Sequence, residues 1–464
     1  MLSISIRSTL LAALAGLSGC AALAPPPALS SFVVMGADGA GVARVLTAGA
    51  ACPPIRLDGR SVRMSVRAPA ATIAQRPTVS PAEESKPSAF PLLACEARIP
   101  AGTAQASVDG QPLPLPRARV ARIVVLGDTG CRLKSPAAYQ DCNSTLAYPF
   151  ARVAALAAAW KPDLVVHAGD YHYRENACPA DRPGCAGSPW GYGWDAWNAD
   201  FFTPGRPLLQ AAPWVMARGN HESCARAGQG FLRFLDPRAL LPGRDCNDAA
   251  DDGVGDFSDP YAVALGPSAQ LIVLDTSSNA SKGFAPPDAR LTKYADSYRK
   301  MTALSRQAPY NIAVFHHPIL GFGATRNQAG VASLFDGDKG LQQAFGAVDP
   351  GLMPENVKAV LSGHVHLWQQ ISFSSAHPTQ FISGFSGTSG DTVPLPQALP
   401  QAGRPAPGAV VEDMSSWVGG FGYMTMERTG VDQWAVTVWD TQGAVRNTCI
   451  VTGSKSRCAT AQVR

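Results

Sequence analysis

The sequence carries little charge for its length. Of its 464 residues only 16% are charged, the formal net charge is +4, and no Lys/Arg-rich run occurs. Proteins that bind nucleic acid usually present a strongly basic face to the phosphates. The composition therefore predicts that nucleic acid is not a sequence-specific partner.

The chain also lacks an apolar run long enough to span a membrane, which takes about 18 residues or more. Near its start, Arg7 precedes a short apolar stretch over residues 10–17. A positive residue followed by an apolar segment of that length is typical of a secretory signal peptide. We therefore expect the protein to be exported.

The signal region ends in the residues LSGC, of which the last is Cys20. Small residues before a cysteine resemble the lipobox of bacterial lipoproteins, which implies that residues 1–19 are removed and that Cys20 is lipidated. A plain signal peptide cleaved nearby is the alternative. Because no Asp follows Cys20, the lipoprotein interpretation favours the periplasmic face of the outer membrane.

Cysteine pairs with the C-x-x-C spacing are missing, so a cysteine zinc site is not expected. The sequence has eleven cysteines, and Cys20 leaves ten, an even number that indicates disulfides in an exported chain. We predict that neighbours along the chain pair with one another. These pairs are Cys52–Cys95, Cys131–Cys142, Cys178–Cys185, Cys224–Cys246 and Cys449–Cys458.

The character of the sequence changes near residue 119. Residues 20–118 are rich in Pro and Ala and contain short alternating segments, which predicts a tether and a small β-rich region. Residues 119–445 contain the buried-type apolar runs of a catalytic domain. Residues 446–464 are expected to form a C-terminal tail with a possible disulfide.

An α/β order follows from the apolar runs of residues 119–445. The strand-like ARIVVLGD is followed by STLAYPFARVAALAAAW, which has helical apolar spacing, and then by DLVVHAGD. Four later segments repeat one pattern, in which an apolar run leads into a turn with polar residues. This order predicts an α/β sandwich whose ligands lie at the carboxyl ends of its strands.

Residues of metal-binding type follow these predicted strands. Only eight His occur in the chain, and five of them lie in three such motifs. Carboxylates, imidazoles, an amide oxygen and a phenolate suit Fe, Mn or Zn, and one carboxylate can bridge two cations about 3.5–4 Å apart. The residues are Asp128, Asp170, Tyr173, Asn220, His221, His316, His317, His364 and His366.

This set resembles the calcineurin-like metallophosphoesterases and, within them, the purple acid phosphatases. The general family begins with Asp-x-His, whereas this chain has Asp128-Thr129-Gly130. The purple enzymes also lack that His and have a Tyr three residues after the second Asp, the position of Tyr173 after Asp170. The resemblance implies a four-layer α/β/β/α sandwich with a small N-terminal β-rich region.

The resemblance also implies two metal ions bridged by Asp170. Because a phenolate is anionic and hard, it favours Fe3+ in the first site, with Fe2+, Zn2+ or Mn2+ in the second. The first ion would take Asp128, Asp170, Tyr173 and His366, and the second Asp170, Asn220, His316 and His364. The family's His-x-Pro pattern favours His316, with His317 as the alternative ligand; His317 and His172 are also possible outer-shell groups.

The predicted reaction is hydrolysis of a phosphate monoester of a small molecule by an acid phosphatase. The metals would polarise the phosphoryl oxygen and provide a bound hydroxide that attacks phosphorus in line with the leaving group. We expect His221 to contact the phosphate or protonate the leaving group, and Glu222 to orient His221. A phosphodiesterase or nucleotidase with the same centre is the alternative, and a non-catalytic surface lipoprotein that binds metal or phosphate is another.

Two further segments have open interpretations. The acid-rich DCNDAADDGVGDFSD, residues 245–259, suggests either a calcium site or a solvated loop, although its spacing departs from the EF-hand pattern. The aromatic segment with Trp190, Trp194 and Trp197 suggests either packing over the site entrance or a surface on which a leaving group stacks.

Overall fold

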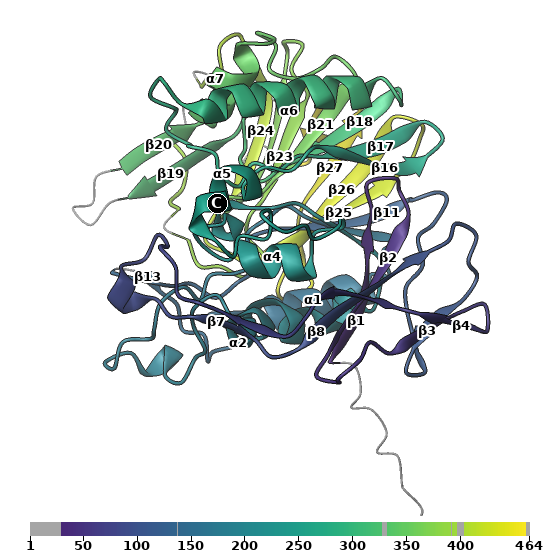
Figure 1. Cartoon of the computed structure of the whole chain (residues 1–464). Helices are drawn as coiled ribbons and strands as arrows, with labels where there is room; N and C mark the ends of the chain where they lie inside the picture. The colour runs from purple at the N-terminus through teal and green to yellow at the C-terminus, as the bar shows by residue number, and fades with distance from the viewer. Residues whose placement is uncertain (1–28, 137, 327–331, 391, 397–402, 461–464) are drawn as a thin grey trace, which may run out of the picture.

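The computed structural model describes residues 29–136, 138–326, 332–390, 392–396 and 403–460 (Figure 1). The expected signal peptide and Cys20 lie outside these residues. Within them, no helix combines the length and the apolar character that crossing a membrane requires.

Two large sheets form the centre of the molecule. The 11-stranded sheet has the order β28 (Lys455–Cys458), β27 (Val445–Thr452), β26 (Gln433–Asp440), β25 (Gly422–Arg428), β11 (Arg122–Leu126), β14 (Leu164–His167), β15 (Trp214–Met216), β1 (Ser30–Met35), β2 (Gly41–Thr47), β8 (Leu93–Ile99) and β5 (Ser65–Ala68). The 7-stranded sheet has the order β16 (Tyr261–Gly266), β17 (Ala269–Val273), β18 (Tyr310–Val314), β21 (Val357–Ser362), β23 (Thr379–Ser383), β22 (Trp368–Phe373) and β24 (Val411–Trp417).

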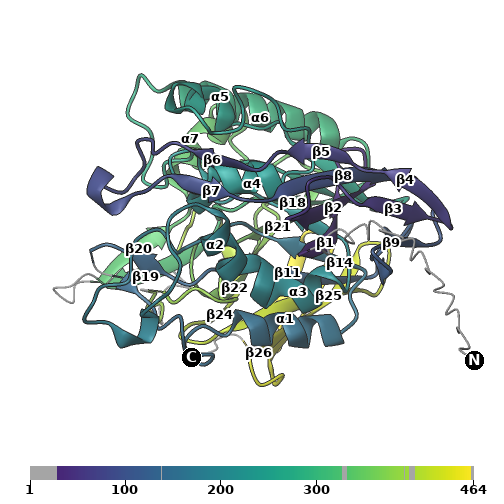
Figure 2. The ribbon, with the colours of Figure 1, turned by 60° about the horizontal axis from the view of Figure 1, so that its bottom comes forward.

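Helices cover the outer faces of both sheets. The helices are α1 (Phe150–Ala159), α2 (Trp194–Trp197), α3 (Thr203–Leu209), α4 (Gly228–Phe234), α5 (Asp252–Gly255), α6 (Ala289–Ser305) and α7 (Lys339–Gly346). Figure 1 shows α6 and α7 above the 7-stranded sheet, and Figure 2 shows α1 and α3 in front of the other sheet. The predicted four-layer α/β/β/α fold is therefore confirmed.

Alternating side chains divide the core into layers, because successive residues of a strand point to opposite faces. In β11, Ile123 and Val125 pack between the sheets with Ile312 of β18. Val124 of the same strand points outward and packs in one cluster with Val153 of α1. One strand thus contributes to two separate apolar cores.

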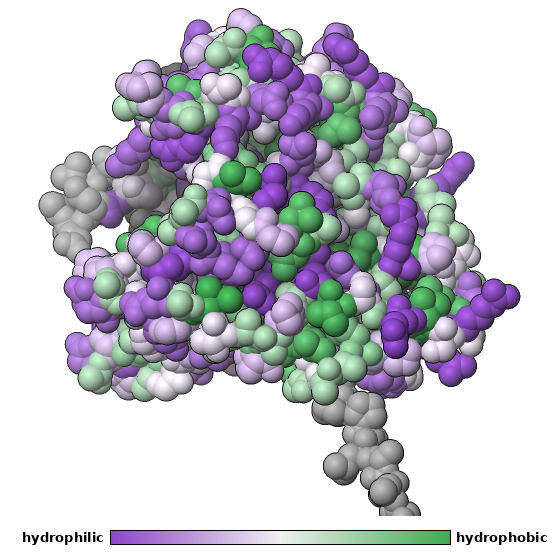
Figure 3. All heavy atoms as spheres, viewed as in Figure 1, coloured by the Kyte–Doolittle hydropathy of each residue, from purple (hydrophilic) through white to green (hydrophobic). Residues whose placement is uncertain are grey.

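Four smaller sheets, one of four strands and three of two, lie beside the two large sheets. They are β3 (Pro54–Leu57) and β4 (Arg60–Arg63) with β9 (Ala106–Val108) and β10 (Gln111–Pro112), β6 (Ala71–Ile73) with β7 (Ser88–Phe90), β12 (Leu133–Lys134) with β13 (Ala138–Tyr139), and β19 (Phe322–Arg326) with β20 (Ala332–Asp336). The face in Figure 3 mixes hydrophilic residues with small, separate apolar groups.

The strand-rich N-terminal region is continuous with the large sheet. Strand β1 runs parallel to β15, with Val34 opposite Trp214. From β2, the buried Arg44 donates through Nη1 to the carbonyl oxygen of Phe234 at 2.8 Å, at the C-terminus of α4. A cation satisfies the last carbonyls of a helix and opposes its dipole. The N-terminal strands therefore stabilise the helix that follows the Asn220 loop.

The residues expected to form a C-terminal tail lie largely in strands. β27 pairs with β26 and β28 pairs with β27, so the large sheet continues beyond residue 445 up to Cys458. The predicted boundaries at residues 118 and 445 thus fall within one hydrogen-bonded sheet. The alternation of apolar residues after residue 445 was too short to identify these strands from the sequence.

The five predicted disulfides are all present. They join Cys52 to Cys95, Cys131 to Cys142, Cys178 to Cys185, Cys224 to Cys246, and Cys449 to Cys458. Disulfides persist in oxidising compartments, so this set suggests an exported protein.

The aromatic segment is part of the core. Trp197 is fully buried in the cluster that includes Phe231 of α4. The ammonium group of Lys86 lies over the ring of Trp190, 4.5 Å from its centroid. Packing is therefore the role of Trp197, and the expectation that it offers a stacking surface is wrong.

We predict that Gly230→Ala destabilises the protein by about 1–3 kcal/mol, because an added methylene group overpacks a filled core. A Cβ at this position would lie 2.0 Å from Nε1 of the buried Trp197. Urea unfolding followed by tryptophan fluorescence measures the change. The matched control is Gly253→Ala, whose Cβ would meet nothing within 4 Å; equal midpoints for the two variants would contradict the packing argument.

Candidate metal centre

The predicted ligands follow parallel strands of both sheets. Asp128, Asp170 and Asn220 come after β11, β14 and β15, which are neighbours in the large sheet. His316 and His364 come after β18 and β21, which are neighbours in the second sheet. The carboxyl ends of these strands meet where the two sheets face one another, so five loops converge on one place.

A first cluster surrounds the phenol of Tyr173. Its hydroxyl oxygen lies 2.8 Å from Oδ1 of Asp128, 2.8 Å from Oδ2 of Asp170 and 3.0 Å from Nε2 of His366. Nε2 of His366 lies 3.3 Å from the same Oδ1 of Asp128. Four side chains from three loops therefore direct their polar atoms at a single point.

A second cluster shares Asp170 with the first. Nε2 of His316 lies 3.0 Å from Oδ2 of Asp170 and 3.1 Å from Oδ1 of Asn220. Nδ1 of His364 lies 2.9 Å from that amide oxygen. Asp170, His316 and His364 are, within the described residues, the one group of three acidic, Cys or His side chains whose ligand atoms lie within 4.8 Å of one another.

The backbone of the cluster is held in an uncommon conformation. Asp128, Asp170 and His364 have φ values of 55°, 60° and 70°. Left-handed backbone at residues other than Gly costs on the order of 1–3 kcal/mol each, and persists where the surroundings fix it. Gly219 shows how tight these surroundings are, because a Cβ there would lie 2.1 Å from Oδ1 of Asp170.

Glu222 supports this backbone and does not orient His221 as we expected. Its buried carboxylate accepts hydrogen bonds from the backbone N–H groups of Asp170 at 2.9 Å, Tyr171 at 2.8 Å, His172 at 3.2 Å and Gly219 at 3.1 Å. Burial and the neighbouring Asp170 raise the pKa of Glu222 to about 8. The expected pairing with His221 was wrong because adjacent residues on a tight turn point in different directions.

Glu175 takes the place that we expected for Glu222. Its Oε1 lies 2.6 Å from Nδ1 of His221 and 3.6 Å from Nε of Arg226. The ring of His221 also lies over that of Tyr173, with centroids 3.9 Å apart. Burial and the charge of Arg226 lower the pKa of His221 to about 4, although two carboxylates oppose this. Glu175 stands in no motif, so nothing in the sequence pointed to this role.

Asp200 is a second residue that the sequence did not reveal. It is fully buried, and its Oδ2 accepts a hydrogen bond from the N–H of Tyr173 at 2.7 Å. Its Oδ1 accepts from the N–H of Cys131 at 3.0 Å and from Nε of Arg174 at 2.6 Å. Asp200 therefore ties together the loops after β11 and β14.

The two expected outer-shell histidines have different positions. The ring centroid of His317 lies 4.5 Å from that of His364, and its Nδ1 is 3.0 Å from Oγ1 of Thr276, so it lies behind the second cluster. His172 is fully buried, with Nε2 2.9 Å from the carbonyl oxygen of Gly191. His172 therefore lies in the protein interior, and its role as an outer-shell group stays a prediction.

Burial and neighbouring charges shift the pKa values of the residues in both clusters. Burial and the carboxylates of Asp128 and Asp170 raise the pKa of Tyr173 well above its ordinary value. Burial opposes protonation of His316, but Asp170 outweighs it and raises the pKa of His316 to about 9. Burial and the charge of His316 lower the pKa of His364 to about 3.

A cavity of about 280 Å³ opens onto both clusters. Asp170, Tyr173, Asn220, His221, His364 and His366 form its floor. Arg132 and Lys134 line its wall, and Phe335 of β20 and Thr325 of β19 also contribute to the lining. The clusters are thus accessible to a small ligand.

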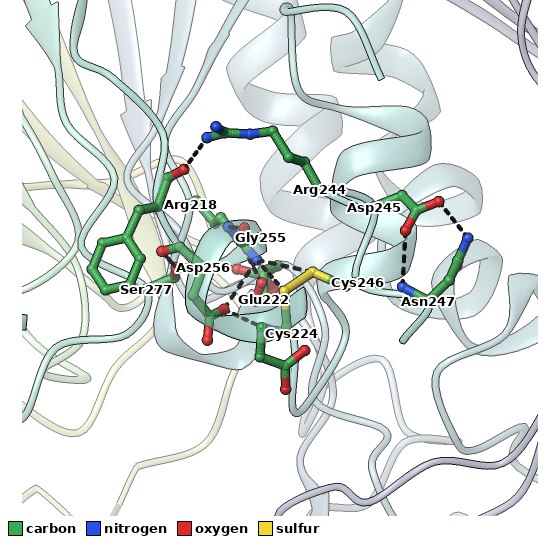
Figure 4. The surroundings of a disulfide bond; sticks show 12 residues. Arg218, Glu222, Cys224, Arg244, Asp245, Cys246, Asn247, Gly255, Asp256 and Ser277 are labelled. Atoms are coloured by element: carbon green, nitrogen blue, oxygen red, sulfur yellow. Dashed lines mark hydrogen bonds and ion pairs between the residues drawn. A yellow bond between two sulfur atoms is a disulfide. The ribbon is translucent and has the colours of Figure 1, made fainter. Parts of the chain in front are cut away.

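The Asn220 turn is anchored by Arg218 and a disulfide (Figure 4). The buried Arg218 donates through Nε to the carbonyl oxygen of Glu222 at 2.7 Å and through Nη1 to Oδ2 of Asp275 at 3.2 Å. Its Nη2 lies 3.6 Å from Sγ of Cys224 and 3.5 Å from Sγ of Cys246. One guanidinium therefore connects the turn, the second sheet and the Cys224–Cys246 bridge.

The acid-rich segment contributes to this anchor. Asp256 accepts a hydrogen bond from the N–H of Cys224 at 2.6 Å and lies 3.4 Å from Nη2 of Arg218. Asp245 accepts from the N–H and side-chain amide of Asn247. Asp256 and Asp245 therefore accept hydrogen bonds from the protein itself. These bonds give both acids a role that does not require calcium.

The fold and the strand-end clusters agree with the comparisons. The calcineurin-like phosphoesterase family matches residues 121–367, more than half of the chain, so the chain belongs to that family. It is accordingly a metal-dependent phosphoester hydrolase, and its substrate is phosphorylated. Comparison with curated proteins finds no match.

Two solved structures share the fold. The purple acid phosphatase PPD1 from yellow lupin (Lupinus luteus) seeds is 14% identical, with a TM-score of 0.53 over 94% of this chain and 75% of that one. A structure of PhoD is 12% identical, with a TM-score of 0.53 over 95% of this chain and 93% of that one. Both likenesses extend through the N-terminal strands.

We predict that Arg218→Met destabilises the protein by about 3–5 kcal/mol, because it leaves the buried Asp275 without its cation. Chemical denaturation measures the loss. Arg244→Met is the control, since Arg244 is exposed and donates only to the carbonyl oxygen of Phe257, so a change within about 0.5 kcal/mol is expected. A similar small change in Arg218→Met would show that the anchor is dispensable.

Proposed function

We propose that the protein is an acid phosphatase that hydrolyses phosphate monoesters with a dinuclear metal centre. The observation that carries the proposal is the position of Asp170, whose Oδ2 lies 2.8 Å from the phenol oxygen of Tyr173 and 3.0 Å from Nε2 of His316. One carboxylate oxygen therefore belongs to both clusters, as a ligand that bridges two cations must.

The donor atoms fit cations. The hydroxyl group of Tyr173 has one hydrogen, yet two carboxylate oxygens and Nε2 of His366 lie within 3.0 Å of its oxygen. A hydroxyl donor can satisfy one of them well. A cation among these atoms would satisfy all four, and a strongly charged one would hold Tyr173 as a phenolate despite its raised pKa.

The orientation of His316 supports the second cation. Nδ1 of His316 lies 2.8 Å from the carbonyl oxygen of Ala168. When Nδ1 carries the hydrogen of a neutral imidazole and donates to a carbonyl, Nε2 presents its lone pair to a metal. That nitrogen is the one beside Asp170 and Asn220.

We assign Asp128, Asp170, Tyr173 and His366 to the first cation, and Asp170, Asn220, His316 and His364 to the second. When bound, the two cations supply Lewis-acid polarisation of the phosphoryl group and a water of lowered pKa. The phenolate favours Fe3+ in the first site, with Fe2+, Zn2+ or Mn2+ in the second.

The chain itself positions the substrate. His221 lines the cavity, and Glu175 at 2.6 Å fixes its Nδ1. Its other ring nitrogen carries a hydrogen only when the imidazole is protonated, and in that form it would contact the phosphoryl group or pass a proton to the leaving oxygen. Glu222 acts through the backbone of residues 170–172 and is a positioning residue.

Export by a lipoprotein signal completes the proposal. The five disulfides support an oxidising compartment, and Cys20 would carry the lipid that holds the protein at the periplasmic face of the outer membrane.

We predict that the pure iron-loaded protein has a broad visible absorption band from charge transfer between Tyr173 and Fe3+. Tyr173→Phe removes the band while metal analysis still finds iron, because the remaining ligands stay in place. Tyr298→Phe removes a phenol that hydrogen-bonds to Asp349, away from the clusters, and keeps the band. A band that survives in Tyr173→Phe would refute the ligand assignment.

We predict a preference of at least about tenfold in kcat/KM for nitrophenyl phosphate over bis-nitrophenyl phosphate, which corresponds to about 1.4 kcal/mol of transition-state stabilisation. Rates on both compounds between pH 4 and 8 decide between the candidates. The reverse preference would identify a phosphodiesterase. Full metal content without turnover of either compound would favour a binding protein.

A further inference from the structure

Strand β12 and the residue before it place two cations in the lining of the metal cavity. Side chains alternate along a strand. Leu133 is fully buried, so its neighbours Arg132 and Lys134 share the opposite face, and both line the cavity. The same cavity is lined by Asp170 and Tyr173.

The position of β12 is fixed relative to the clusters. The N–H of Leu133 donates to the carbonyl oxygen of Tyr173 at 2.9 Å, and the N–H of Glu175 donates to the carbonyl oxygen of Leu133 at 3.1 Å. The disulfide of Cys131 with Cys142 holds the residue before Arg132. Lys134 is therefore carried by a short strand bonded directly to the loop of Tyr173.

Lys134 also lines a second hollow of about 540 Å³. Ser80 and Glu84 of the N-terminal region form one side of this hollow, and Glu175 and Arg226 form another. Because Lys134 belongs to both linings, it marks the place where they adjoin.

The carboxylate of Glu175, whose charge acts on Lys134, is already engaged by other side chains. Glu175 already lies 2.6 Å from Nδ1 of His221 and 3.6 Å from Nε of Arg226. Burial and the neighbouring charge of Arg226 lower the pKa of Lys134. Among the described side chains, none forms an ion pair with Lys134 within 4.0 Å. An incoming anion would therefore stabilise a partly buried ammonium group that the protein leaves uncompensated.

We propose that Lys134 binds a second acidic group, a carboxylate or a phosphate, on the leaving group of the substrate. The preferred substrates are then phosphate monoesters of acidic alcohols. This inference rests on the proposed phosphatase function and adds a substrate class to it. A charged residue placed to pair with one substrate group discriminates strongly against the analogue that lacks the group.

The test compares 3-phosphoglycerate with glycerol 3-phosphate, which differ at the far end by a carboxylate in place of a hydroxymethyl group. We expect the wild-type enzyme to favour 3-phosphoglycerate by about tenfold in kcat/KM, as one charge-assisted contact provides. Lys134→Met should reduce this ratio to about one, and Lys134→Arg should retain most of it because the positive charge remains.

Lys300→Met serves as the matched control. Lys300 is an exposed lysine of α6 that forms ion pairs with Asp259 and with Asp296. The ratio of kcat/KM for 3-phosphoglycerate to kcat/KM for glycerol 3-phosphate should be the same in Lys300→Met as in the wild-type enzyme. A wild-type ratio near one, in an enzyme that hydrolyses nitrophenyl phosphate, would overturn the inference alone. So would an equal loss on both substrates in Lys134→Met, which would mean that Lys134 contacts the transferred phosphoryl group. Inactivity of the metal-loaded wild type on nitrophenyl phosphate would overturn the proposed function, and the inference with it.

Discussion

The organisation of the centre depends on how firmly the carboxylate of Asp170 is held. Its backbone N–H donates to Glu222, its own Oδ1 accepts from the N–H of His221 at 2.8 Å, and its Oδ2 is left for the two clusters. The first two of these bonds tie the loop after β14 to the turn after β15. The left-handed backbone of Asp170 is tolerated because these contacts surround it on all sides.

The supporting residues form a layer beneath the ligands. Glu222 and Asp200 accept hydrogen bonds from consecutive backbone N–H groups of the Asp170–Arg174 loop, and Arg218 fixes the turn that carries Asn220. Buried acids of this kind cost desolvation energy and are retained where several donors compensate them. Backbone N–H groups therefore compensate much of the desolvation of the buried carboxylates of Glu222 and Asp200. The side chains of the ligands remain directed at the cavity.

The sequence indicates which loops would carry the ligands but hides the residues that support them, for a physical reason. Asp128, Asp170, Asn220, His316 and His364 each follow an apolar strand, and parallel strands in adjacent positions must bring their ends together. Glu175 and Asp200 belong to no such pattern, because their roles arise from contacts with loops distant in the sequence. The pairing of β1 with β15 was equally hidden, since strand partners are set by tertiary packing.

That pairing has a consequence for where the enzyme works. Ser30 is already fixed in the large sheet, and ten Cα-to-Cα steps lead from Cys20 to it. A fully extended chain of that length reaches at most about 33–36 Å. With the proposed lipid at Cys20, strand β1 would be tethered within this distance of the bilayer, so hydrolysis would take place close to the headgroups.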